Sequence, residues 1–305
     1  MIIFKRSGDL AGWLQKRRAE GRSIGFVPTM GALHEGHMSL IDISKRSVPV
    51  TVCSIFVNPA QFNDPRDFQQ YPVTLEEDIF LLEKAGVDAL YLPAVDEVYP
   101  AGMKDLEKYD LGRLETILEG KFRPGHFQGV CQVMRRLLDL VSPDHLFMGQ
   151  KDYQQCMVIR RLLQIMGSPT ILHPCPIVRE EDGLAMSSRN RRLTPEQRKK
   201  ATAIYQALTG LKEAASNTLP APTYNLQAAS AAPGSAAIPF LDAMQAPLDT
   251  ARHILESNDF RIDYIELAQA DDLEPLSAAA PPEVIALIAA FQGEVRLIDN
   301  LILKP

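Results

Sequence analysis

The chain has 305 residues, of which 46% are apolar and 23% are charged; this composition excludes a disordered protein and allows one large domain or two ordinary ones. Its net charge of −6 argues against a general nucleic-acid-binding protein, which usually carries a basic face or tail. The apolar run after Met1 is too short for a signal peptide, and no run approaches the roughly 18 residues of a membrane span. We therefore expect a cytoplasmic protein that binds neither nucleic acid nor a membrane.

Strand-like and helix-like segments alternate in the first half of the chain. Residues 23–27 form a short apolar run that stops at Pro28, and residues 50–57 are almost continuously apolar and β-branched. The second pattern is typical of a strand covered on both faces, as in a parallel sheet. An amphipathic helix is predicted at 75–85 and another strand at 89–92. This order indicates βαβ units with right-handed crossovers.

A further helix is predicted at 128–140, and the composition changes near residue 178. Thr194 and Gln197 form a capping box with a proline between them, which predicts a helix that begins there and continues to about residue 215. Residues 216–248 are rich in Ala, Pro, Ser and Asn. That composition predicts a flexible insertion or linker.

Strand patterns return at 261–267, 284–290 and 295–303. Their mixture with helical segments indicates a small α+β domain. We therefore predict an α/β domain with a parallel sheet over residues 1–177 and a smaller α+β domain over residues 178–305.

The four cysteines are scattered along the chain and form no C-x-x-C pair. They are Cys53, Cys131, Cys156 and Cys175. We expect reduced, buried thiols, as in a cytoplasmic protein, rather than a disulfide or zinc framework.

The first candidate site is the run PTMGALHEGH at residues 28–37, between a predicted strand and a helix-like run. Ligands of α/β sheets bind at such positions, and the first N–H groups of a helix favour phosphate. Gly31 and Gly36 allow close backbone approach, while His34 and His37 can donate to a phosphate oxygen. A glycine-containing turn with two ordinary histidines remains an alternative. Zinc binding is disfavoured because a third ligand is missing and the run is not H-E-x-x-H.

The run FVNPAQF at residues 56–62 follows the most strongly predicted strand. Asn58 and Gln61 offer amide donors and acceptors at the carboxyl edge of the sheet, and a glutamine suits a hydroxy acid because it can both donate and accept. The alternative is turn chemistry alone, since Asn-Pro is a common turn pair.

Two later runs carry charges suited to a nucleotide. In GQKDYQQ, at residues 149–155, Lys151 can neutralise phosphate and Asp152 can orient a ribose, a metal or the lysine. In MSSRNRR, at residues 186–192, hydroxyls and arginines can close on phosphates. A solvated Lys-Asp pair and a basic surface turn are the respective alternatives.

Together, in this order, PTMGALHEGH, FVNPAQF, RPGHFQGV, GQKDYQQ and MSSRN resemble the pantothenate synthetase family. The resemblance covers residues 1–212 and returns at 261–303. The H-x-G-H element alone is shared with a wider nucleotidyltransferase superfamily that includes class I aminoacyl-tRNA synthetases. Its combination with FVNPAQF and KDYQQ is far more specific.

The resemblance implies a Rossmann-like ATP-binding domain with a smaller C-terminal lid domain, usually in a homodimer. It implies ATP and Mg²⁺, and a ligase that condenses (R)-pantoate with β-alanine to pantothenate through pantoyl adenylate, releasing AMP and pyrophosphate. One alternative is a nucleotidyltransferase that moves NMP to a phosphorylated acceptor. Another is a nucleotide-binding protein without turnover.

The resemblance also assigns roles to individual residues. The implied ATP-binding residues are Met30, Gly31, Ala32, Leu33, His34, Glu35, Gly36, His37, Gly149, Gln150, Lys151, Asp152, Val178, Met186, Ser187, Ser188 and Arg189. Of these, His37, His34 and Lys151 are the expected catalytic residues. Gln61 and Gln155 are expected to hold pantoate, with Asn58 as a further substrate-binding candidate. No side chain is expected to be a metal ligand.

Overall fold

The chain divides into two compact units. The computed structural model describes residues 1–62, 68–104, 106–218, 240–276 and 283–304. The first unit consists of Met1–Arg179 and Met186–Ser188, and the second of Glu180–Ala185 and Arg189–Pro305. The division at Arg179/Glu180 lies next to the boundary that we predict at 177/178, and the chain crosses between the units again after Ala185 and after Ser188.

The first unit alternates strands and helices. In chain order it contains β1 (Ile2–Phe4), α1 (Ser7–Ala19), β2 (Ile24–Thr29), α2 (Glu35–Ser47), β3 (Val50–Ile55), η1 (Pro59–Gln61), α4 (Leu75–Lys84), β4 (Ala89–Tyr91), α5 (Val95–Val98), η2 (Gly112–Glu115), α6 (Leu118–Phe122), α7 (His126–Val141), β5 (His145–Gly149), η3 (Gln150–Asp152), α8 (Tyr153–Met166) and β6 (Ile171–Cys175). The strands predicted at 23–27, 50–57 and 89–92, and the helices predicted at 75–85 and 128–140, are confirmed with ends that differ by a few residues.

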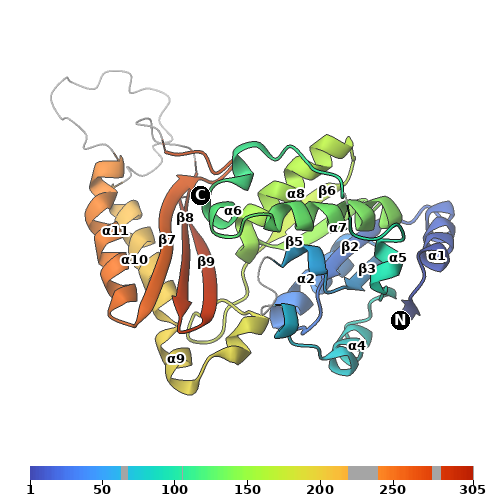
Figure 1. Cartoon of the computed structure of the whole chain (residues 1–305), viewed down its shortest axis with the longest axis horizontal. Helices are drawn as coiled ribbons and strands as arrows, with labels where there is room; N and C mark the ends of the chain where they lie inside the picture. Colours follow the sequence, from blue (N-terminus) through green and yellow to red (C-terminus); the bar gives the residue numbers. More distant parts are fainter. Residues whose placement is uncertain (63–67, 105, 219–239, 277–282, 305) are drawn as a thin grey trace. The chain divides into compact units, whose positions relative to one another are not determined.

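The strands of the first unit form a six-stranded parallel sheet in the order β1-β4-β3-β2-β5-β6 (Figure 1). Phe26 of β2 pairs with Val52 of β3 on one side and with Leu146 of β5 on the other. The chain builds outward from β2 through β3 and β4, and then places β5 on the opposite side. Ligands bind at such a reversal because the loops after the two neighbouring strands separate there.

Burial explains why the central strands are so apolar. All six residues of β3 are buried, and α2 packs on β3 as well as on β2 and β5. The neighbouring strands β5 and β6 are packed by α8. Val27, Ile41, Leu82 and Phe147 belong to the resulting core. The predicted parallel-sheet fold class is confirmed.

The second unit is an antiparallel sheet with two helices. It contains most of η4 (Ser188–Arg192), α9 (Pro195–Lys200), α10 (Ala203–Thr218), α11 (Phe240–Glu256), β7 (Phe260–Gln269), β8 (Val284–Gln292) and β9 (Val295–Lys304). The strand order is β7-β8-β9, and Figure 1 shows α10 and α11 side by side along the sheet, with α10 on β8 and β9 and α11 on β7. The predicted capping box is present, since Thr194 accepts from the Gln197 backbone and the Gln197 side chain accepts from Thr194.

The flexible insertion predicted at 216–248 is wrong at both ends. Residues 216–218 complete α10, and residues 240–248 form the first half of α11. Phe240 and Met244 lie one helical turn apart and are buried in the core of the second unit, and this apolar contact outweighs the Ala/Pro-rich composition and the Pro247 inside the helix. The rest of the predicted insertion, 219–239, lies outside the described residues.

Two further expectations concern the whole chain. Within the part of the chain that the structure describes, no helix has both the length and the apolarity to cross a bilayer. All four cysteines are free and buried, as predicted. Burial raises the pKa of the Cys53 thiol to about 12, so this thiol stays protonated at neutral pH.

Candidate active site

The loop after β2 ends in a helix cap built from the two histidines. His34 is the N-cap of α2, and its Nδ1 accepts a hydrogen bond from the Gly36 backbone N–H at 3.1 Å. The His34 N–H in turn donates to Nδ1 of His37 at 3.3 Å. The imidazoles therefore replace the Ser/Thr and Glu/Gln of an ordinary capping box, and their ring centroids lie 4.2 Å apart.

These hydrogen bonds fix the tautomer of His37. Because its Nδ1 accepts, the proton of the neutral ring lies on Nε2. Burial, and to a lesser extent the positive charge of Lys151, lowers the pKa of His37 to about 4. At neutral pH the ring is therefore uncharged and offers Nε2–H as a donor beside the N-terminus of α2, where an anion is favoured.

Both predicted glycines of this loop are required by its geometry. A Cβ at Gly36 would lie 2.8 Å from Cε1 of His34, so a side chain there would displace the cap. Gly31 has a φ of +80°, and a Cβ there would lie 3.0 Å from a carboxylate oxygen of Asp78. Ala32 follows with a φ of +50°, a conformation that needs support when the residue is not glycine.

Asp78 of α4 supplies that support. Its Oδ2 accepts from the Ala32 N–H at 2.9 Å, its Oδ1 accepts from the Leu33 N–H at 2.8 Å, and the Thr74 hydroxyl donates to Oδ1 at 3.1 Å. The side chain is 2% exposed. A buried carboxylate bonded to two consecutive amides holds the loop in the conformation that presents the histidines.

The turn at η1 joins the first loop. The Gln61 side chain donates through Nε2 to the Met30 sulfur at 2.8 Å, and its Oε1 accepts from Asn58 Nδ2 at 3.4 Å. Two runs that are 31 residues apart in sequence thus meet through their candidate ligand-binding side chains.

The side chain of Asn58 makes its hydrogen bonds within the protein. The side chain is fully buried; it donates to the Gly129 carbonyl at 3.1 Å and accepts from the Ala60 N–H and the Tyr99 hydroxyl. The direct substrate contact expected for Asn58 conflicts with this burial, because its hydrogen-bonding atoms are already engaged within the protein. Its contact with Gln61 makes it a positioning residue instead.

His126, from the RPGHFQGV run, fixes the same turn from the other side. Its Nε2 lies 3.0 Å from the Arg123 guanidinium and its Nδ1 2.8 Å from the Gln61 carbonyl. Arginine can only donate, so Nε2 accepts and Nδ1–H donates to Gln61. Burial, followed by the Arg123 charge, lowers the pKa of His126 to about 3. Gly129 completes the contact, since a Cβ there would lie 2.1 Å from the Ala60 carbonyl oxygen.

The loop after β5 carries Lys151 and adjoins the loop after β2, because β5 is the other neighbour of β2 in the sheet. The Lys151 charge acts on His37 and the Asp152 charge acts on His126. The two glutamines that follow differ in role. Gln154 is 2% exposed and bonds backbone groups of residues 114–119, whereas Gln155 is half-buried.

The segment Met186–Ser188 returns to the first unit. A Cβ at Gly36 would lie 3.9 Å from Cβ of Met186, which places Met186 beside the start of α2. The Met186 N–H donates to the Val178 carbonyl at 3.0 Å, so these two residues are also neighbours. Arg189 belongs to the second unit.

The structure thus brings runs from five parts of the chain to one edge of the sheet. They supply His34 and His37, Gln61, His126, Lys151, and Met186. Sequence reasoning missed the supporting roles of Asp78 and His126. The sequence signal for Asp78 is its place in the first turn of α4, and nothing local to the residue shows that it reaches the loop 45 residues away.

Comparisons with known proteins agree over the whole chain. A family model described as pantoate–beta-alanine ligase matches residues 2–302. The chain is 40% identical over 309 residues to a pantothenate synthetase of Caldicellulosiruptor bescii, covering 100% of this chain and 99% of the relative. It is 42% identical over 285 residues to the pantothenate synthetase of Thermus thermophilus, covering 92% and 94%.

Solved structures show the same fold. A crystal structure of pantothenate synthetase from Thermus thermophilus has a TM-score of 0.86 at 39% identity, with both chains covered completely. A crystal structure of the Francisella tularensis pantoate–beta-alanine ligase, complexed with beta-gamma ATP and beta-alanine, has a TM-score of 0.74 at 34% identity and covers 99% of this chain and 98% of that one.

Proposed function

Because this chain belongs to the pantoate–β-alanine ligase family, we infer that it catalyses the ATP-dependent condensation of pantoate with β-alanine to give pantothenate. The observation that carries the assignment to the site lies where the strand order reverses at β2. There Gln61 contacts Met30 of the loop that also carries His37, and the Lys151 charge acts on His37. The Francisella relative with beta-gamma ATP and beta-alanine supports ATP and β-alanine as the ligands.

In the first proposed step, a pantoate carboxylate oxygen attacks the α-phosphorus of ATP. The bond from that phosphorus to the bridging oxygen of the β-phosphate breaks, and pyrophosphate leaves with the electron pair. His37 donates Nε2–H to a phosphate oxygen without losing its own proton, and Lys151 balances the negative charge that develops. A neutral donor suits this role because His37 has a pKa of about 4.

In the second step, the β-alanine amine attacks the acyl carbon of pantoyl adenylate. The acyl–oxygen bond breaks, AMP leaves, and the amine gives up a proton as the amide forms. No protein nucleophile is needed because AMP is already a good leaving group. Gln61 and Gln155 hold pantoate, and the remaining expected ATP-binding residues supply position and exclude water.

Mg²⁺ fits this site as a companion of ATP. Magnesium bound to nucleotides takes most of its ligands from phosphates and water, so a cluster of protein carboxylates is not required; among the described residues there is no such cluster. The exposed Asp152, next to Lys151, is the residue we propose to hold its water shell. The ion would neutralise phosphate charge.

We propose that the second unit acts as the lid and that the chain works as a homodimer in the cytoplasm. The resemblance to the family supports the first two proposals. Four free, buried thiols support a reducing compartment.

The decisive experiment is to incubate the purified chain with ATP, Mg²⁺, pantoate and β-alanine and to measure AMP, pyrophosphate and pantothenate. We expect equal amounts of the three products, and no sustained AMP release when β-alanine is omitted. His37→Ala should lower turnover by roughly 10²- to 10³-fold, the usual effect of losing one charge-stabilising donor. NMP transfer to a phosphorylated acceptor without amide formation would instead support the nucleotidyltransferase alternative, which the family match does not favour.

A further inference from the structure

Residues 178–186 fold into a tight hairpin next to the expected phosphate-binding segment. The Met186 N–H donates to the Val178 carbonyl at 3.0 Å, and the Glu180 N–H donates to the Leu184 carbonyl at 2.8 Å. At the tip, the Gly183 N–H donates to the Glu180 carbonyl at 2.9 Å, and Gly183 has a φ of +91°. We call this segment the 178–186 hairpin.

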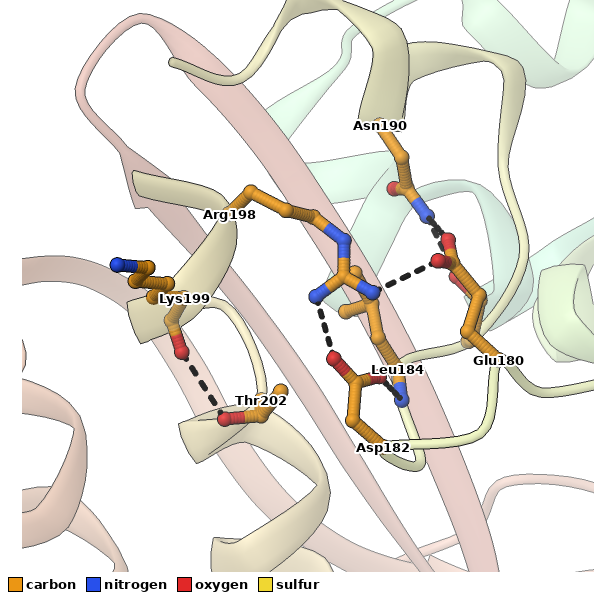
Figure 2. Close-up of polar contacts among 8 residues, drawn as sticks. Glu180, Asp182, Leu184, Asn190, Arg198, Lys199 and Thr202 are labelled. Carbon is orange, nitrogen blue, oxygen red and sulfur yellow. Dashed lines mark hydrogen bonds and ion pairs between the residues drawn. The ribbon is translucent and has the colours of Figure 1, made fainter. Parts of the chain in front are cut away.

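Arg198 of α9 holds the tip of the hairpin with both of its terminal nitrogens (Figure 2). One lies 2.7 Å from Oε2 of Glu180 and the other 2.7 Å from Oδ2 of Asp182. Oδ1 of Asp182 accepts from the Leu184 N–H at 3.2 Å. A planar guanidinium is suited to such a forked contact, whereas an ammonium ion would satisfy only part of it.

Asn190 links the same carboxylate to the segment that follows the hairpin. Its Nδ2 donates to Oε1 of Glu180 at 3.0 Å (Figure 2). The same Nδ2 donates to the Ala185 carbonyl at 3.1 Å. Ala185 and Asn190 are the residues immediately before and after the run 186–189, which contains the two serines and Arg189. The hydrogen bond between them therefore closes this run into a short loop, which we call the 186–189 loop.

The hairpin tip packs tightly against α10. A Cβ at Gly183 would lie 2.1 Å from the Tyr205 ring of that helix. Arg198, Glu180, Asp182 and Asn190 all belong to the second unit, and the chain returns to the first unit only for residues 186–188. The 186–189 loop is thus linked through Asn190 and Glu180 to Arg198. We call the contacts of Arg198 with Glu180 and Asp182 the anchor.

We propose that Arg198 is a positioning residue for ATP: it holds the 186–189 loop in the shape that binds the triphosphate, without itself touching the nucleotide. This inference rests on the proposed function, in which that loop closes over the phosphates. A triphosphate that is held by hydroxyls and Arg189 needs several donors in the right positions at once. Without the anchor, the 186–189 loop keeps these donors but adopts many conformations. ATP binding then has to order the loop, and the conformational entropy lost in doing so weakens the binding.

A change in the KM for ATP without a change in the thermal midpoint would distinguish a positioning role of Arg198 from a role in overall stability. Glu180 and Asp182 side chains are 32% and 43% exposed, and ion pairs this accessible contribute little to folding, about 0 to 1 kcal/mol. Arg198→Met should therefore leave the thermal midpoint nearly unchanged. It should raise the KM for ATP about tenfold while the KM values for pantoate and β-alanine stay near those of the original chain.

The test measures initial rates of AMP formation with each substrate varied in turn, for the unmodified chain and for Arg198→Met, Arg198→Lys and Glu180→Gln. Lys199→Met is the matched control, because Lys199 is the next residue of α9 and its side chain makes no part of the anchor. We expect an intermediate KM for ATP in Arg198→Lys, since a lysine keeps the charge but loses the fork. Arg198→Met combined with Glu180→Gln should be no worse than Arg198→Met alone, because both act through one path.

Hydrogen exchange provides a readout that does not depend on turnover. In Arg198→Met, amide exchange within 184–190 should accelerate at least tenfold, as expected when the hydrogen bonds that close a loop open locally, while exchange in α10 stays unchanged. An unchanged KM for ATP, unchanged exchange in 184–190, or an equal rise of all three KM values with a lower thermal midpoint would each overturn the inference. If Arg198→Met does not fold, Asp182→Asn tests the same anchor. Failure of the unmodified chain to form AMP would overturn the proposed function, and the exchange data would still report on the anchor.

Discussion

At the scale of single residues, buried polar side chains determine where the reactive ones point. Asp78 holds the backbone of the histidine loop, Asn58 holds the Gln61 side chain, and His126 holds the Gln61 carbonyl. A side chain whose hydrogen-bonding atoms are all engaged inside the protein cannot also bind a ligand. It can place a neighbour, because a buried hydrogen bond left unmade is costly.

Asp78→Asn tests this supporting shell. The amide keeps one acceptor oxygen but turns an NH₂ group towards one of the two backbone N–H donors of Ala32 and Leu33. We expect the free energy of unfolding to fall by about 2 kcal/mol, the range for losing a hydrogen bond to a buried charged group. The kcat/KM for ATP should fall about tenfold, since the loop that carries His37 is displaced.

Glu77→Gln is the control for Asp78→Asn, because Glu77 is the preceding residue of α4 and is exposed. Thermal melts and steady-state rates with ATP varied would be measured for both variants. An Asp78→Asn protein that matches Glu77→Gln in both measurements would show that the carboxylate does not support the loop.

At the scale of elements, the close approach of α7 to η1 fixes the substrate-binding turn. Gly129 allows this approach, while Asn58 and His126 bond across the contact. The position of η1 therefore depends on α7, and a displacement of α7 would move Gln61 as well.

Gly129→Ala should separate the two elements. The added methyl would lie 2.1 Å from a backbone oxygen and 2.7 Å from Cα of Gln61, and backbone atoms cannot rotate away as a side chain can. Overpacking of this kind lowers the free energy of unfolding by about 1–3 kcal/mol. The KM for pantoate should rise, because Gln61 moves.

Gly12→Ala is the matched control for Gly129→Ala. Gly12 also lies in a helix, α1, and a Cβ there meets nothing within 4 Å. Alanine should raise the free energy of unfolding by about 0.5–1 kcal/mol there, since it restricts the unfolded chain and favours the helix. Urea titrations compare the two variants; equal stability of the two would argue against a close α7–η1 contact.

At the scale of the whole molecule, the two units differ in their expected response to acid. Five of the six histidines belong to the first unit and only His253 to the second. Of these, His37 and His126 have pKa values lowered by burial to about 4 and about 3. Lys151 acts on the first ring, and Arg123 faces the second.

The first unit should therefore lose stability as the pH falls. The ordinary histidine pKa is 6.5, whereas that of His126 in the folded protein is about 3. Between these two pH values the His126 ring is protonated in the unfolded chain but not in the folded chain. The free energy of unfolding consequently declines as the pH drops through this window, by a few kcal/mol for a fully buried ring. His126 should contribute more than His37, because its pKa is lowered further, to about 3 rather than to about 4.

Thermal midpoints at about pH 7, 6, 5 and 4 would measure this effect, since these values span the window in which the rings take up protons. His126→Asn should flatten the dependence on pH, although it lowers the midpoint at neutral pH by removing two hydrogen bonds. His253→Asn, at an exposed site of the second unit, is the control. A parallel pH dependence in all three proteins would contradict the assignment.

Local sequence patterns were sufficient to predict the helices and strands whose formation depends on residues close together in the chain. Continuous apolar runs determined β2, β3 and β4, and the Thr194 capping box determined the start of α9. The helix α11 escaped prediction because its apolar stripe begins beside Ala/Pro-rich sequence and becomes stable only against the core of the second unit. Similarly, the single helix predicted from 195 to 215 is divided between α9 and α10 at Ala201 and Thr202.

The sequence by itself determined which residue types are available for the site and, through the family resemblance, the reaction. Only the tertiary structure decided which of these residues are available to a ligand and which support the fold. Gln155 is half-buried, whereas the side chain of its neighbour Gln154 is hydrogen-bonded to backbone groups. Asp78 and His126 support loops that are far from them in sequence. The physical reason is that a polar side chain can bond either to a ligand or to a backbone group, and its local sequence is the same in both cases. Only the packing of distant elements determines which partner lies within reach.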